Sequence, residues 1–257
     1  MFYLAQKINL PTMNAARSKR KLFQPDFFLA AFAALSLANF TCIATQFQPG
    51  IFLTKPLLLA SLAAWFYLKT KDYPTLFSQL MLAGFLLSMA GDTLLMLIKS
   101  GGEQFFLFGL GSFLVAHVCY IFAFVKYPKV RSGLVWRKPL LKVPFLIFLV
   151  FMLAFLWADL PGGMKLPVVF YCCVIVFMAI NALNMSRRAS VSAAKLLFFG
   201  AILFVISDAI IALHKFKFPE MPEIPTSLAI MATYLAGQFL LANGSTKANS
   251  EASSFLF

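Results

Sequence analysis

Long apolar runs separated by short polar stretches form the main pattern along this chain. A helix needs about 20 apolar residues to cross about 30 Å of hydrocarbon. The runs are continuous and do not alternate with polar residues, which favours helices over the strands of a membrane barrel. We predict eight spans, at 27–45, 51–68, 76–98, 105–125, 143–158, 166–185, 196–214 and 224–242. Their short connections predict an all-α integral membrane fold, built as an eight-helix transmembrane bundle.

Composition supports this prediction and excludes several classes of protein. Of 257 residues, 61% are hydrophobic and only 12% are charged, whereas a soluble domain carries about 25% charged residues. So little charge could not cover a soluble surface. A disordered chain, a secreted disulfide scaffold and a nucleic-acid-binding protein are therefore excluded. The two histidines, His117 and His214, lie far apart in sequence, so we expect no metal site built on them.

The basic residues are distributed unequally between the two sides of the predicted bundle. Seventeen of the 22 Lys and Arg residues fall on one side, four fall on the other, and Lys55 lies within a span. The positive-inside rule then puts both termini in the cytoplasm. We expect a basic cytoplasmic tail at 1–26, a transmembrane domain at 27–242 and a mobile polar cytoplasmic tail at 243–257. The net charge of +13 is thus a topology signal rather than the sign of a nucleic-acid partner.

Two acidic residues lie inside spans, Asp92 in the third and Asp208 in the seventh. An aspartate near a helix centre costs about 2.5–3.5 kcal/mol on insertion scales, so such a residue marks a functional site by default. The alternative is a structural role, in which the acid pairs with Lys55 or forms a hydrogen bond between helices.

The segments around the two acids share a pattern. Residues 84–99 read GFLLSMAGDTLLMLIK and residues 200–215 read GAILFVISDAIIALHK, with Gly, Asp and Lys in common register. The copies lie four spans apart and so run in the same direction, which predicts two four-helix halves in a parallel repeat. Both acids fall in the half of the membrane away from the cytoplasm. The axis between the halves would therefore bring them face to face in one cavity.

Other polar residues lie at membrane depth and are candidates for binding or orienting a substrate. Each one alone is more typical of a hydrogen bond between helices, but together with two acids they indicate a polar cavity. Gln238 follows Tyr234 by four residues and so shares its helix face. The candidates are Lys55, His117, Tyr120, Tyr171, Asn181, Tyr234 and Gln238.

Two neighbouring carboxylates out of water cannot both ionise cheaply, so one keeps its proton while the other stays ionised. Such a pair provides a proton donor beside an anionic stabiliser. Glycosidases use this arrangement on an acetal, and a pair in a membrane cavity suits a lipid with an acid-labile ether. The same pair equally suits a proton-coupled transporter. Composition and spacing leave both open.

The motifs along the chain resemble those of the YhhN-like family of multi-pass membrane lysoplasmalogenases. The resemblance runs from about residue 27 to residue 243. Five matches in order carry it: Lys55-Pro56-Leu57, Gly91-Asp92-x-Leu-Leu, Ala116-His117 with Tyr120, Ser207-Asp208-x-Ile-Ile-Ala, and Tyr234-x-x-x-Gln238. The long basic amino-terminal tail departs from the family pattern.

The resemblance implies an ether hydrolase that cleaves the vinyl ether bond of lysoplasmalogens. The products would be a fatty aldehyde and glycerophosphoethanolamine or glycerophosphocholine, and no metal or organic cofactor is implied. Asp92 and Asp208 would be catalytic, Lys55 would hold the lipid phosphate, and the other polar candidates would orient water and carboxylates. A proton-coupled transporter and a non-catalytic lipid-binding scaffold are the rival readings. Short loops favour a bacterial inner membrane, or the endoplasmic reticulum if the host is eukaryotic.

Overall fold

The fold was examined in a computed structural model that describes residues 24–98, 102, 104–128 and 132–254. Most of the expected basic tail at 1–26 lies outside these residues. Eight helices of the described chain are long and apolar enough to cross a membrane. They are α2 (Pro25–Ala44), α3 (Gln48–Thr70), α4 (Leu76–Met96), α6 (Gln104–Lys126), α8 (Val143–Leu156), α9 (Gly162–Asn184), α10 (Val191–Ala212) and α11 (Glu223–Ser253). The fifth span reaches this length only together with the turn before α8, as Pro139–Leu156, and the seventh continues beyond α10 to Lys217.

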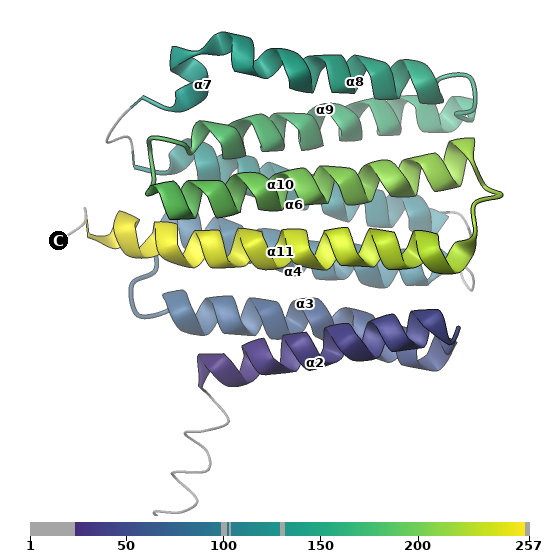
Figure 1. The fold of residues 1–257 in the computed structure, drawn as a ribbon, viewed down its shortest axis with the longest axis horizontal. Coiled ribbons are helices and arrows are strands. Elements are labelled where there is room, and N and C mark those ends of the chain that lie inside the picture. The colour runs from purple at the N-terminus through teal and green to yellow at the C-terminus, as the bar shows by residue number, and fades with distance from the viewer. Residues whose placement is uncertain (1–23, 99–101, 103, 129–131, 255–257) are drawn as a thin grey trace, which may run out of the picture.

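Short elements complete the described chain. The turns α7 (Leu134–Arg137) and η1 (Pro139–Lys142) precede α8, and a π-helical segment, η2 (Leu213–Lys217), extends α10. The long helices run roughly antiparallel, as Figure 1 shows. The predicted eight-span, all-α membrane fold is confirmed, and its boundaries fall within a few residues of those expected in most spans.

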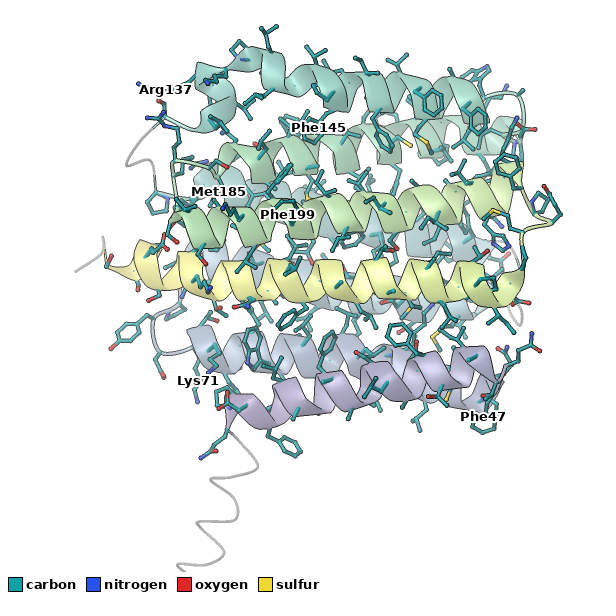
Figure 2. All side chains as sticks on the ribbon, viewed as in Figure 1. Phe47, Lys71, Arg137, Phe145, Met185 and Phe199 are labelled. Carbon is teal, nitrogen blue, oxygen red and sulfur yellow. The ribbon has the colours of Figure 1, made fainter. Side chains whose placement is uncertain are left out.

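The two ends of the bundle differ in their side chains. The start of α2 and the end of α11 lie at the same end (Figure 1). Lys71 and Arg137 lie at that end, and Phe47 lies at the opposite one (Figure 2). We call the end that carries Lys71 and Arg137 the basic end, and the end that carries Phe47 the outer end.

The segment expected as a mobile tail at 243–257 differs from that prediction. Residues 243–253 continue α11 as helix. Asn249 explains this, because its amide accepts a hydrogen bond from Thr75 at 2.6 Å and donates one to the Tyr73 carbonyl at 3.1 Å. Small residues such as Ala248 and Ala252 let this part of the helix pack closely. Some polar side chains of this segment, such as Asn249 and Ser245, are therefore buried against neighbouring segments rather than exposed to water.

Glycines allow two helix pairs to pack closely, and they position the site. A methyl group at Gly84 of α4 would lie 2.1 Å from the Tyr120 ring of α6, and one at Gly91 would lie 2.6 Å from the Phe113 ring. In the other pair, a methyl group at Gly200 of α10 would lie 2.8 Å from the Leu241 nitrogen of α11. Small residues at membrane helix interfaces permit such approach. The pairs α4–α6 and α10–α11 are the third and fourth helices of each predicted half.

Candidate functional site

Each intramembrane acid accepts a hydrogen bond from a tyrosine on another helix. The Tyr234 hydroxyl of α11 donates to Asp92 Oδ2 of α4 at 2.6 Å. The Tyr171 hydroxyl of α9 donates to Asp208 Oδ2 of α10. Asp92 is 4% exposed and Asp208 is partly buried. The tyrosines therefore hold both carboxylates in defined orientations inside the bundle.

The two acids belong to one site. They lie close enough to interact electrostatically, and Asp92 also interacts with Lys55. Lys55 lies two turns into α3, with its side chain only partly buried. Five helices thus supply the two acids and the charged and hydroxyl groups around them: α3, α4, α9, α10 and α11. The site joins elements from both predicted halves.

The remaining polar candidates differ in their distance from the acids. The Tyr120 hydroxyl donates to Gln238 Oε1 at 3.3 Å. His117 packs edge-on against the Tyr171 ring at 5.5 Å and the Phe204 ring at 4.7 Å between centroids. Asn181 is not brought to this site: it lies ten residues beyond Tyr171 along α9, and its amide donates to the Phe177 carbonyl of its own helix at 2.8 Å.

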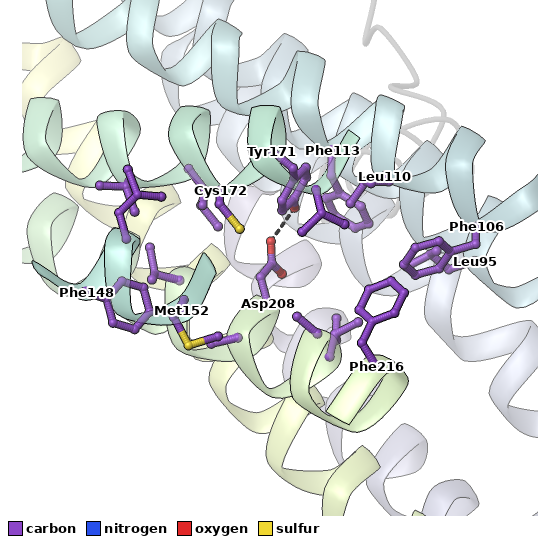
Figure 3. A pocket seen from close by; sticks show the side chains of 18 residues that line it. Leu95, Phe106, Leu110, Phe113, Phe148, Met152, Tyr171, Cys172, Asp208 and Phe216 are labelled. Carbon is purple, nitrogen blue, oxygen red and sulfur yellow. Dashed lines mark hydrogen bonds between the residues drawn. The ribbon is translucent and has the colours of Figure 1, made fainter. Parts of the chain in front are cut away.

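An apolar cavity of about 70 Å³ opens beside Asp208. Figure 3 shows Asp208 and Tyr171 directed toward each other, with Cys172 and Met152 nearby. Leucine, valine and phenylalanine side chains form most of the wall, and Asp208 is the one charged group among the described residues that line it. Such a lining suits a hydrocarbon chain.

A larger hollow of about 820 Å³ lies at the outer end. Lys55, His214, Lys215 and Glu223 contribute charged or polar groups to its wall. The two spaces are neighbours, because Leu95, Phe106 and Ile211 line both. An apolar compartment that Asp208 lines therefore meets a charged one that Lys55 lines.

Several residues of the site were not singled out from the sequence. Phe113 and Phe204 pack against the Tyr234 ring at 6.0 and 5.4 Å between centroids. Ser88 lies fully buried one turn before Asp92. The four-residue spacing between Ser88 and Asp92 was a usable signal, whereas the aromatic contacts were hidden among the 31 phenylalanines. Among the residues described, no three His, Cys, Asp or Glu side chains are grouped as metal ligands would be.

The fold and site together define a multi-pass helical membrane protein with an interacting pair of intramembrane carboxylates. This chain belongs to the YhhN family, whose sequence profile matches residues 50–245.

Curated relatives carry one functional name. The chain is 34% identical over 167 residues to lysoplasmalogenase TMEM86A of Bos taurus, covering 62% of each protein. It is 27% identical over 247 residues to a lysoplasmalogenase of Mycobacterium bovis, covering 93% of this chain and 88% of the relative. The match to the bovine relative thus spans a little under two thirds of that protein's length. No solved structure matches the chain.

Proposed function

We propose that this protein is a lysoplasmalogenase, which hydrolyses the vinyl ether bond of a lysophospholipid held in the membrane. The observation that carries the proposal is the pair Asp92 and Asp208, which interact with each other and each accept a tyrosine hydrogen bond. The names of the relatives, from cattle to mycobacteria, support the same reaction.

The surroundings of the acids support different roles for them. Asp92 is almost completely buried, which opposes its ionisation, and the positive charge of Lys55 nearby offsets part of that cost. Asp208 faces a mainly apolar cavity, which favours a neutral acid. We therefore assign Asp208 as the proton donor and Asp92 as the anionic stabiliser and base.

The substrate fits the two compartments by polarity. The first carbons of the alkenyl chain would enter the apolar cavity beside Asp208. The phosphate and headgroup would occupy the outer hollow, with Lys55 near the phosphate. The vinyl ether then lies between them, where the carboxylates are. His117, Tyr120, Tyr171, Tyr234 and Gln238 would orient water and carboxylates.

The reaction follows from these positions. Asp208 gives its proton to the vinyl carbon that is not bonded to oxygen, and the neighbouring carbon becomes part of an oxocarbenium ion. The Asp92 carboxylate stabilises this cation and takes a proton from the water that attacks it. As the hemiacetal collapses, its hydroxyl proton passes to Asp208 while Asp92 protonates the departing glycerol oxygen, which restores both acids to their starting states. An aldehyde and a glycerophosphodiester alcohol are released.

The experiment that tests the proposal supplies the purified protein with lysoplasmenylethanolamine and measures aldehyde. Wild-type protein should release aldehyde and glycerophosphoethanolamine in equal amounts. Absence of release, with proton-driven flux of solute in liposomes, would instead favour a transporter. Lipid binding without either activity would favour a scaffold.

The basic end supports a further proposal about placement in the membrane. Lys71, Arg137 and the end of α11 gather there, so we assign that end and both termini to the cytoplasm. The short connections favour the inner membrane of a bacterium. A reporter that is active only in the cytoplasm should therefore be active when it is fused after residue 257.

A further inference from the structure

Three fully buried polar side chains near the carboxylates, Ser88, His117 and Gln238, keep polar atoms that are not fully satisfied; each is 0% exposed. Ser88 Oγ, the two nitrogens of His117 and Gln238 Nε2 have no hydrogen bond of good geometry to any described residue. The backbone carbonyl of Phe113, one turn earlier in the same helix, lies near His117. The unpartnered amide of Gln238 has two N–H groups to donate. This is an unusual concentration of unpaired groups in a membrane core.

These groups form one connected cluster that reaches both acids. The Tyr120 hydroxyl donates to Gln238 Oε1 and also lies near the Ser88 hydroxyl, within reach of a weak hydrogen bond. Gln238 lies within similar reach of the Tyr234 hydroxyl, which donates to Asp92. His117 contacts the ring of Tyr171, which donates to Asp208. Gln238 and His117 are therefore each one side chain away from a carboxylate, and Ser88 joins the cluster through Tyr120.

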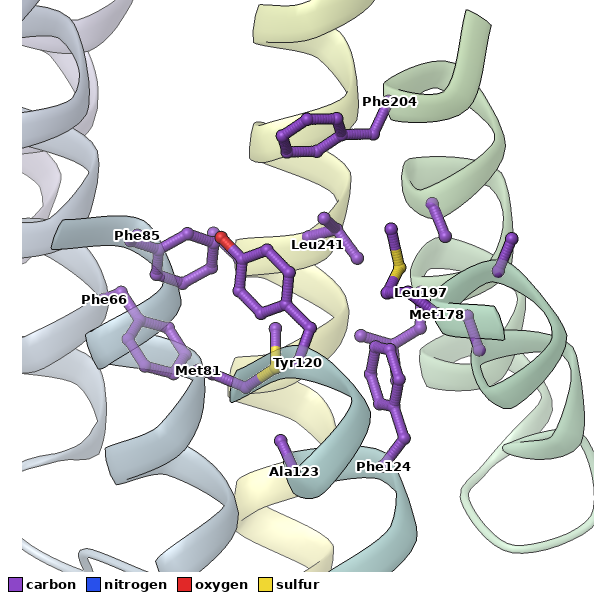
Figure 4. Packing of buried hydrophobic residues seen from close by; sticks show 14 of the residues in the cluster. Phe66, Met81, Phe85, Tyr120, Ala123, Phe124, Met178, Leu197, Phe204 and Leu241 are labelled. Carbon is purple, nitrogen blue, oxygen red and sulfur yellow. The ribbon is translucent and has the colours of Figure 1, made fainter. Parts of the chain in front are cut away.

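An apolar layer separates this cluster from the basic end. About one turn closer to that end than Phe85, Tyr120 and Gln238, each of the three helices carries a buried apolar side chain. These are Met81, Phe124 and Leu241, and all three are 0% exposed (Figure 4). Beyond them lie buried polar groups such as Ser78, Ser245 and Asn249. The apolar layer therefore separates the cluster from these groups near the basic end.

Buried polar groups without protein partners are normally satisfied by ordered water, whereas apolar cavities stay dry. We propose that Ser88, His117, Gln238 and Tyr120 bind at least one enclosed water molecule next to the carboxylates. Resting on the proposed function, this site stores the water that Asp92 activates for attack on the oxocarbenium ion. Its oxygen leaves in the aldehyde, and another water enters from the outer hollow between turnovers.

The first half of the proposal is tested without substrate, by radiolytic hydroxyl labelling of the full chain in detergent. Radicals formed from bound water oxidise the side chains beside it. After correction for intrinsic reactivity, His117 and Tyr120 should label at least about threefold more than Phe66 and Leu62, which are equally buried in the hydrophobic core. Equal labelling would mean a dry cluster and would overturn the proposal. In Gln238→Leu the labelling of Tyr120 should fall to the level of the controls.

The second half is tested by the split between kcat and KM. Ser88→Ala should lower kcat about tenfold and leave KM unchanged, because it disturbs water and not the lipid. The matched control is Ser61→Ala, whose buried hydroxyl already donates to the Leu58 carbonyl; its kcat should stay as in wild type. If Ser88→Ala raises KM alone, the water is not the nucleophile. If the wild type releases no aldehyde, the proposed function fails while the labelling result stands.

Discussion

Asp92 and Asp208 occupy the same position in two copies of one sequence pattern, but their surroundings differ. The helix before α4 supplies Lys55 near Asp92, whereas the helix before α10 supplies the Tyr171 hydroxyl to Asp208. Asp92 is almost completely buried, and Asp208 faces an apolar cavity.

The partners of the acids also break the symmetry of the two halves. Tyr234 of α11 donates to Asp92, but Tyr120, in the corresponding helix of the other half, donates to Gln238 instead of Asp208. A repeated backbone pattern thus carries two chemically distinct carboxylates. Repulsion between two close carboxylates already separates their protonation states, and the difference in surroundings decides which of the two keeps the proton.

Removing either carboxylate should have the largest effect. Asp92→Asn and Asp208→Asn keep nearly the same shape, yet each should lower kcat by about 10²–10⁴-fold, the range typical for loss of an acid or base. Aldehyde release by purified, monodisperse variants is the measurement. Asp26→Asn, in an exposed acid paired with Lys69, should leave activity unchanged. Full activity in either intramembrane variant would contradict the catalytic roles.

The two tyrosines should separate the roles of the acids. A hydrogen bond to a charged group contributes about 1.5–3 kcal/mol, and one between neutral groups about 0.5–1.5 kcal/mol. Since we assign Asp92 as ionised, Tyr234→Phe should lower kcat about 10- to 100-fold, and Tyr171→Phe only about two- to tenfold. Steady-state kinetics on both variants checks this. The reverse order would exchange the roles of Asp92 and Asp208.

The lysines of the two halves provide a matched pair. Lys55 lines the outer hollow, whereas Lys165 near the start of α9 lies over the Trp157 ring at 4.7 Å. Lys55→Met should raise KM for a lysophospholipid about tenfold, a loss of about 1.4 kcal/mol in phosphate binding. Lys165→Met should leave KM unchanged. Equal effects would mean that both lysines act only at the membrane surface.

Two adjacent cysteines test the apolar cavity of the Asp208 half. Cys172 lines it, and Cys173 is exposed on the outside of the bundle. Cys172→Phe should raise KM for long-chain substrates about fivefold, since overfilling a packed space costs about 1–3 kcal/mol. Cys173→Phe should behave as wild type. If Cys172→Phe leaves KM unchanged, the chain binds elsewhere.

The span pattern and the two acids were readable from the sequence for a physical reason. Hydrocarbon demands long apolar helices, so a polar residue such as Asp92 stands out against them. Partners could not be read in the same way. Tyr171 and Tyr234 were both candidates, but nothing in the spacing says which tyrosine reaches which acid, because that depends on how the helices pack.

Two further features of the structure could not be predicted from sequence patterns: the direction of the Asn181 side chain and the contacts of residues 243–253. Asn181 was as polar and as deep as Gln238, yet it faces its own helix backbone instead of the site. Residues 243–253 looked like a tail because the segment is polar, and its sequence does not show that Asn249 has partners elsewhere in the chain. Those partners, Thr75 and the Tyr73 carbonyl, lie more than 170 residues away in sequence, and only the fold brings them together.

The last helices of the two halves differ in length, and this difference gives the smallest expected effect on activity. α6 ends at Lys126, whereas α11 continues to Ser253 and receives a hydrogen bond from Tyr127 on the Ala248 carbonyl at 3.2 Å. Asn249→Ala would leave the Thr75 hydroxyl and the Tyr73 carbonyl without this partner, which should destabilise the protein by about 1–3 kcal/mol.

The midpoint of thermal unfolding in detergent measures this loss of stability. The kcat should stay within about twofold of wild type, because the segment lies at the end of the bundle away from the acids. Ser253→Ala is the control, since its exposed hydroxyl donates only to the Ser250 carbonyl of the same helix. An unchanged midpoint in Asn249→Ala would mean that the extension of α11 packs through Ala248 and Ala252 alone. A lower kcat at full stability would instead connect the basic end to the reaction and remove the distinction between a catalytic outer half and a structural basic end.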